Sequence, residues 1–182
     1  MQAAQQFSQR LPETDALGTL KGLKHEWSSS LSLREMQAAR HPNCVVCAAA
    51  NLAGLGLDFR IQQDEAVEAD FGCPEALQGY PGILHGGVIA TVLDGAMANC
   101  LFTRRIEAVT ADLRIRYRHP VSTGTKATVR AWPEESHRAL HVMRAQLFQD
   151  GQIKATATAK FVELTPGTAA ENGCPSQPHT KA

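Results

Sequence analysis

The stretch from Val88 to Phe102 constrains the fold most, because Asp94 is its only charged residue. Glycine and proline interrupt the chain just before it, at Pro81, Gly82 and the Gly86–Gly87 pair, and its apolar residues then recur with helical spacing. The opposite side of this helix consists of small residues and is nearly non-polar too, so other elements must cover it on almost every side. A carboxylate in such surroundings is costly unless it is paired, protonated or needed for chemistry. Asp94 is therefore the first candidate for a functional residue.

Composition limits the classes of protein to which the chain can belong. It has 182 residues, with 18 Lys or Arg against 18 Asp or Glu, so a zero net charge gives no field that would attract nucleic acid or an anionic membrane. The first residues lack a basic start followed by a hydrophobic run, and no apolar run reaches the ~18 residues of a membrane span. Five cysteines, an odd number, do not indicate a secreted disulfide framework. We expect a soluble, cytoplasmic protein that binds neither nucleic acid nor a membrane.

Alternating apolar and polar residues predict strands on both sides of the helix. In the first strand after the helix, the alternation places Val109 with Leu113 on one face and Thr110 with Arg114 on the other. Asp150–Gly151 is a strong hairpin turn signal between the last two strands. The predicted strands are residues 57–62, 67–71, 109–118, 125–132, 138–149 and 152–163.

The order of these elements predicts an α+β fold. Ser32 and Glu35 have the spacing of a capping box, which predicts a short helix ending near Arg40. Two strands, one long apolar helix and four more strands are best satisfied by a mostly antiparallel sheet wrapped around the helix. We expect residues 1–43 to form a partly helical extension, 44–164 the domain, and 165–182 a disordered tail.

The start of the long helix is a second candidate for a functional site. The glycines at 86 and 87 leave free backbone N–H groups at the positive end of the helix dipole, an arrangement suited to an oxyanion hole. Asp94 lies seven residues beyond Gly87, about 10 Å along the axis, so one carbonyl group cannot touch both. Two copies with antiparallel helices would bring the helix start of one copy to the carboxylate of the other. The alternative is structural: the glycines permit tight packing and Asp94 pairs with an arginine.

The motifs around this helix resemble those of a known family. His-Gly-Gly at 85–87, an Asp nine residues after that His, Val-Thr-Ala-Asp-Leu at 109–113 and Tyr-Arg-His-Pro at 117–120 are similar to the PaaI-like acyl-CoA thioesterases of the hotdog superfamily. The resemblance covers about residues 44–164. It implies a hotdog fold, a homodimer or a dimer of dimers with active sites at the subunit interface, acyl-CoA as the substrate and no cofactor.

The resemblance also implies roles for individual residues. Gly87 would supply the N–H that polarises the thioester carbonyl, and His85 and Gly86 would shape that loop. Asp94 would be the general base or nucleophile, and Thr110 would orient water beside it. Many relatives carry Asn where this chain has Gly79, so a contact to the carbonyl is missing here or is supplied by another group. The residues expected to line an apolar acyl pocket are Tyr80, Ile83, Leu84, Met97 and Phe102.

Two other functions remain as alternatives to thioester hydrolysis. A non-catalytic acyl-CoA-binding hotdog protein, such as a regulator, would be consistent with Gly79, but residues 1–43 lack the basic character of a DNA-binding extension. A hotdog hydratase would need a second acid–base residue, and after Asp94 the helix offers only Asn99. We therefore predict acyl-CoA thioester hydrolysis.

The remaining polar motifs have competing interpretations. Arg114, Arg116 and Arg118 could bind the phosphates of CoA or form a solvated outer face of the sheet. His41, Cys44 and Cys47 could begin a zinc site, but the sequence has no matching second pair of Cys or His ligands. We therefore predict that these cysteines are small buried residues and that no metal binds. His119, His137 and His141 are expected on strand surfaces or turns.

Overall fold

The computed structural model describes residues 33–164, so the predicted cap at Ser32, most of the extension and the predicted tail lie outside the described residues. Residues 33–40 are helical, which agrees with a short helix ending near Arg40. The long helix α2 runs from Gly86 to Phe102. Within the described part of the chain, no helix has the length and apolar character needed to cross a membrane.

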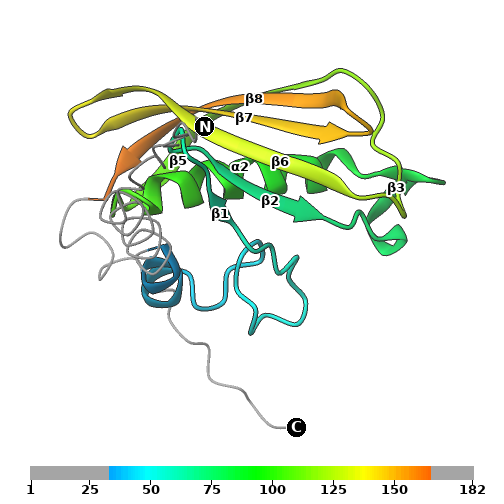
Figure 1. Ribbon diagram of the computed structural model, residues 1–182, viewed down its shortest axis with the longest axis horizontal. Helices are drawn as coiled ribbons and strands as arrows, with labels where there is room; N and C mark the ends of the chain where they lie inside the picture. The colour runs from blue at the N-terminus through cyan, green and yellow to red at the C-terminus, as the bar shows by residue number, and fades with distance from the viewer. Residues whose placement is uncertain (1–32, 165–182) are drawn as a thin grey trace, which may run out of the picture.

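Six strands form one sheet in which every neighbouring pair is antiparallel. The sheet curves over α2, which lies along its concave side (Figure 1). This architecture confirms the predicted α+β hotdog fold. In sheet order the strands are β1 (Arg60–Ile61), β2 (Val67–Phe71), β6 (Ala127–His137), β7 (Leu140–Gln149), β8 (Gln152–Glu163) and β5 (Ala108–Tyr117).

Small side chains on the sheet accommodate the inner side of α2. The face of β6, β7 and β8 that is buried in the core carries a series of alanines, which let a helix with bulky apolar residues approach the sheet closely. These alanines are Ala127, Ala131, Ala145, Ala155, Ala157 and Ala159.

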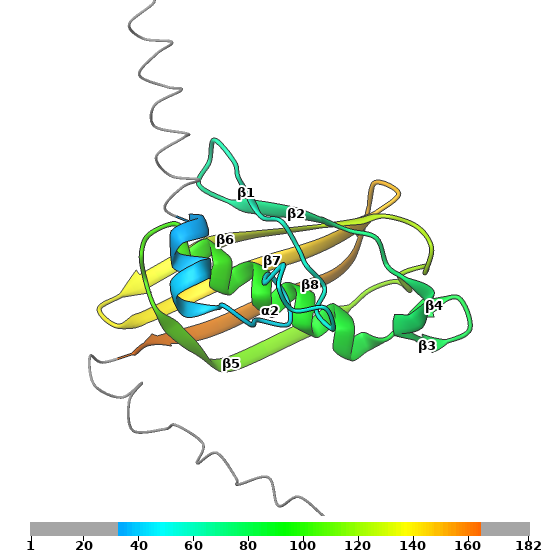
Figure 2. The same ribbon diagram turned by 90° about the horizontal axis from the view of Figure 1, so that it is seen from below.

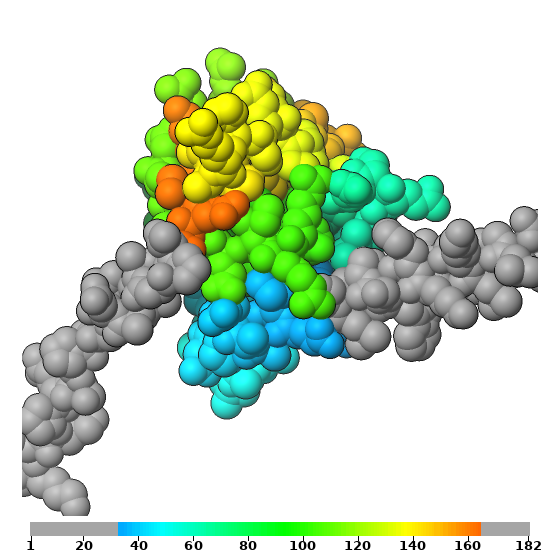
Figure 3. All heavy atoms as spheres, turned by 90° about the vertical axis from the view of Figure 1, so that its left-hand side faces the viewer, coloured from blue at the N-terminus to red at the C-terminus, as the bar shows by residue number. Residues whose placement is uncertain are grey.

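A third layer covers the outer side of α2. The helix at 33–40 and the segment that follows it lie under α2, on the side away from the sheet (Figure 2). The end-on view of Figure 3 shows the sheet, α2 and this N-terminal segment stacked in that order. Val46 contacts the helix so closely that a Cβ built on Gly95 would lie 2.5 Å from its Cγ1. This layer explains why α2 is apolar on nearly every side.

Several boundaries differ from the expected ones. The first strand is only Arg60–Ile61, while β6 continues past Trp132 to His137, with a register shift between Pro133 and Glu135. The Gly/Pro-rich loop before α2 contains a short 3-10 helix, η1 (Glu75–Leu77), and a two-stranded ribbon, β3 (Gln78–Tyr80) and β4 (Ile83–Leu84). The turn at Asp150–Gly151 is as predicted, because both residues have positive φ, 53° and 72°, as a type I′ turn requires.

Candidate active site

The start of α2 is capped by a histidine side chain. His85 is the N-cap residue, and its Nδ1 accepts a hydrogen bond from the backbone N–H of Gly87 at 2.9 Å. An N-cap acceptor satisfies one of the free N–H groups that every helix start exposes. The proposed oxyanion donor therefore already has a partner within its own chain. The sequence did contain a signal for this contact, because His85 stands two positions before Gly87, where an N-cap side chain can accept its N–H.

Two neighbours hold the helix start in place. Tyr117, at the end of β5, donates its hydroxyl to the carbonyl oxygen of Gly86 at 2.9 Å. A Cβ on Gly79 would lie 3.1 Å from Cδ2 of His85, so the absence of a side chain at position 79 makes room for the imidazole ring. The ring of His85 thus lies directly beside Gly79, where a larger residue would press against it.

Asp94 meets Thr110 on the exposed side of α2. The Thr110 hydroxyl donates to Oδ1 of Asp94 at 2.7 Å. The carboxylate is half-buried rather than enclosed, so water can reach it. The structure therefore places the two side chains in direct contact.

A β-bulge in β5 directs Thr110 toward the helix. Thr110 pairs with Phe161 of β8 and Asp112 pairs with Lys160, which leaves Ala111 without a partner. Because directly opposed residues share a face of the sheet, Thr110 points to the buried face with Phe161, and so does Leu113. The predicted alternation placed Thr110 and Leu113 on opposite faces, and this was wrong because strict alternation fails across a bulge.

The two candidate groups are far apart within one chain. Helix α2 is continuous from Gly86 to Phe102, so Gly87 and Asp94 are separated by about two turns, roughly 10 Å along the axis. One thioester cannot contact both groups of the same chain. A site that uses both needs a second copy of α2.

The residues expected to line an acyl pocket do not lie together. Tyr80 is 76% exposed, whereas Leu84 and Met97 are 3% and 0% exposed and belong to the core of the single chain. Phe102 is also buried. A separate cleft of about 310 Å³ is lined by residues 52–57, 70–72, 74, 76 and 77 and does not include Asp94 or Gly87. Near the helix start, Tyr80 and its strand partner Ile83 offer exposed apolar surface, and so does Tyr117, which contacts Gly86.

The arginines after the bulge lie on the opposite face of the sheet from α2. Arg114 pairs with Thr158 and Arg116 with Thr156, on the side away from the buried alanines of β8. All three arginines, including Arg118, are exposed, and within residues 33–164 none forms an ion pair. Their position leaves both interpretations open, a solvated face or contacts to an anionic ligand.

His141 was predicted at a strand surface, but it is buried and fully hydrogen-bonded. Its Nδ1 lies 3.0 Å from the Ser136 hydroxyl and its Nε2 lies 2.8 Å from Oε1 of Glu163. The three residues come from β6, β7 and β8, so the imidazole connects these strands at one end of the sheet. The sequence signal was missed because Ser136 and Glu163 become neighbours of His141 only through strand pairing.

The fold agrees with the comparison to protein families. Residues 81–156 match the model of the family described as Thioesterase superfamily. This match lies within the part of the chain that forms the hotdog fold, from β4 to β8.

The chain is also similar to solved structures and to curated proteins. A phenylacetic acid degradation-related protein from Ralstonia eutropha is 25% identical, with a TM-score of 0.59 over 72% of this chain and 98% of that chain. The E. coli PaaI protein, 18% identical with a TM-score of 0.64 over 75% and 96%, shares the fold. Acyl-coenzyme A thioesterase THEM4 from Rattus norvegicus is 33% identical over 118 residues, and its Mus musculus counterpart is 32% identical over 92. These matches cover 62% and 50% of this chain and 51% and 40% of the relatives, so the chain spans about half their length.

Proposed function

We propose that this protein hydrolyses acyl-CoA thioesters to a free acid and CoA. The observation that carries the proposal is the contact between Asp94 and Thr110 on the exposed side of a helix that begins with His-Gly-Gly. The similarity to acyl-coenzyme A thioesterases supports the choice of substrate class. The free cysteines of the described residues suit a reducing, cytoplasmic location.

In the proposed mechanism, Asp94 is the general base. Thr110 holds Oδ1, and within the described residues no group is hydrogen-bonded to Oδ2, which can accept a proton from water. Attack of this water on the thioester carbonyl places negative charge on the carbonyl oxygen, where one preorganised backbone donor contributes about 3 kcal/mol. The thiolate of CoA is a good leaving group, so the mechanism needs no strong general acid.

We propose that the active site forms between two copies of the chain. Strand β5 is an edge of the sheet, and one long side of it has no partner strand in the described chain. Exposed edge strands readily pair with another chain. A two-fold axis beside β5 would bring Asp94 and Thr110 of one protomer near Gly87 of the other, which supports a homodimer as the catalytic unit.

A non-catalytic acyl-CoA-binding protein is the second candidate, and one observation favours it. The His85 side chain already accepts the hydrogen bond of the Gly87 N–H. Hydrolysis requires that the ring move aside when the thioester binds, whereas simple binding does not.

Replacing the carboxylate of Asp94 separates the two candidates. We expect Asp94→Asn to lower kcat for acyl-CoA hydrolysis by about 10²- to 10⁴-fold, the usual contribution of a general base, because the amide cannot take a proton from water. CoA release from a panel of acetyl- to palmitoyl-CoA and aryl-CoA esters measures the effect. Asp112→Asn is the matched control, since Asp112 is exposed on the same strand as Thr110 and lies beyond the bulge.

The control should keep wild-type turnover, and both variants should keep the wild-type oligomeric state. Unchanged turnover of Asp94→Asn would contradict the mechanism. Tight binding of the CoA esters by the wild-type protein with no hydrolysis of any of them would establish the binding protein instead.

A further inference from the structure

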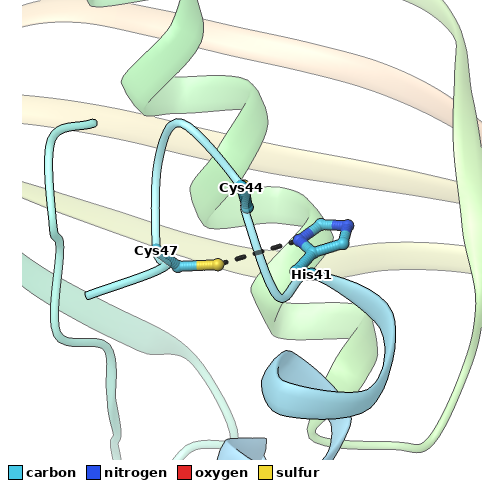
Figure 4. A group of neighbouring side chains, drawn as sticks. All are labelled: His41, Cys44 and Cys47. Atoms are coloured by element: carbon cyan, nitrogen blue, oxygen red, sulfur yellow. Dashed lines mark hydrogen bonds between the residues drawn. The ribbon is translucent and has the colours of Figure 1, made fainter. Parts of the chain in front are cut away.

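A histidine and two cysteines converge beneath helix α2, in the segment that links the helix at 33–40 to β1. Nδ1 of His41 lies 3.7 Å from Sγ of Cys47, and the ligand atoms of His41, Cys44 and Cys47 all lie within 4.8 Å of one another. Figure 4 shows the imidazole ring and the Cys47 sulfur facing each other, with α2 behind them. No part of the proposed hydrolytic mechanism uses these three residues.

The spacing of these atoms is close to that of a tetrahedral metal site. Bond lengths of about 2.3 Å from zinc to sulfur and about 2.0 Å to nitrogen place neighbouring ligand atoms about 3.5–3.8 Å apart. The His41–Cys47 distance already falls in this range, and the largest separation exceeds it by roughly 1 Å at most. Side-chain rotation alone can close such a gap.

The local structure holds the three residues in this arrangement. The His41 ring packs edge-on against Phe102, the last residue of α2, with 4.6 Å between ring centroids. The backbone N–H of Val46 donates to Sγ of Cys44 at 3.3 Å, which fixes the position of this sulfur in the loop. The N–H groups of Leu55 and Leu57 donate to the carbonyl oxygens of Val45 and Val46 and close the loop.

We propose that His41, Cys44 and Cys47 bind one Zn²⁺ ion, with water in the fourth position. All three residues are half-buried, so water has access to the open position. The ion would connect His41 and Cys44, which precede Val46, to Cys47, which follows it. Val46 packs against Gly95 of α2, the residue next to Asp94. The ion would therefore hold in one conformation the loop that presents Val46 to α2.

Metal content of the full chain tests this proposal. We expect the protein, reduced and loaded with zinc, to keep about one ion per chain after gel filtration, measured by mass spectrometry of the metal. Replacement by Co²⁺ should produce visible d–d absorption and a near-ultraviolet thiolate-to-cobalt band. Cys44→Ser and Cys47→Ser should each lose the zinc, and His41→Gln should alter the cobalt spectrum. Cys73→Ala and Cys100→Ala, which remove free cysteines elsewhere in the core, should retain both signals.

A second measurement uses the wild-type protein, in case the serine variants do not fold. Titration with a mercurial thiol reagent in the presence of a metal-binding dye should release the zinc as two thiols are modified. Failure of the reduced protein to take up zinc would overturn the proposal. Zinc that is retained in both serine variants would also overturn it.

Discussion

The contact between Thr110 and Asp94 depends on one unpaired residue, Ala111. Because the bulge gives β5 an extra residue relative to β8, Thr110 faces the helix while Asp112 and the arginines face away from it. Bulges often redirect a side chain at a functional site. The position of a hydroxyl at hydrogen-bonding distance from the candidate base is therefore a property of strand pairing, rather than of Thr110 alone.

The capping role of His85 at the start of α2 could also be filled by another residue with a side-chain acceptor. It caps α2 by accepting the N–H of Gly87. We expect His85→Ala to lower the free energy of unfolding by about 1 kcal/mol, because it removes an N-cap acceptor. Under the proposed function, kcat/KM should stay at or above the wild-type value, since the Gly87 N–H becomes free for the carbonyl oxygen. Denaturant unfolding and CoA release measure the two effects.

His85→Asn is the matched control, because Asn is among the preferred N-cap residues. It should restore most of the lost stability. The opposite result would be a kcat/KM that is at least tenfold lower in His85→Ala but unchanged in His85→Asn. It would show that turnover needs a hydrogen-bond acceptor at this position.

Among the elements, α2 depends on close contact at Gly95. A Cβ there would lie within 2.5 to 2.9 Å of three side-chain atoms of Val46, which a real structure does not tolerate. We expect Gly95→Ala to destabilise the protein by about 1–3 kcal/mol, despite the better helix propensity of alanine, because the covering segment must shift. Gly72→Ala is the control: a Cβ at Gly72 meets nothing within 4 Å, and its stability should change little.

Thermal or denaturant unfolding of the two variants gives the comparison. Equal stability of Gly95→Ala and the wild type would mean that the segment around Val46 does not pack on α2 in solution.

Local patterns predicted most of the elements, whereas contacts between distant segments did not follow from them. The apolar run, the Asp150–Gly151 turn and the strand alternation depend on neighbours in sequence, and each corresponds to an element of the structure. The bulge at Ala111 depends on the register with β8, and the burial of His141 depends on two other strands. The cover over Gly95 comes from a loop about fifty residues earlier in the chain. Similarly, the sequence identified Asp94 and Thr110 as candidate site residues. The hydrogen bond between them follows only from the register of β5 with β8.

At the scale of the whole molecule, the single chain carries two incomplete sites. Asp94 and Thr110 supply a base and its hydroxyl partner, and the start of α2 supplies a backbone donor about 10 Å away. Under the proposed function, each active site needs one half from each protomer. An experiment on mixed dimers can therefore distinguish a site shared between protomers from a site within one chain.

Two inactive variants should restore activity to each other. We expect Asp94→Asn and Gly87→Pro, the latter lacking the N–H, each to be inactive alone. After unfolding and refolding together, random pairing gives about half mixed dimers with one intact site each, or about a quarter of the wild-type activity. CoA release from the refolded mixture, compared with each variant refolded alone, measures the gain. A mixture no more active than its components, although mixed dimers form, would contradict the shared site.

The alanines that face α2 have a consequence for which substrates could fit. Met97 is fully buried in the core that these alanines share with α2, so a hydrocarbon chain placed there would have to displace packed side chains. Under the proposed function, the acyl group must lie outside the core, along the surface shared by the two protomers. Preference for acyl length could then change through surface substitutions alone, so substrate range and folding stability could evolve independently.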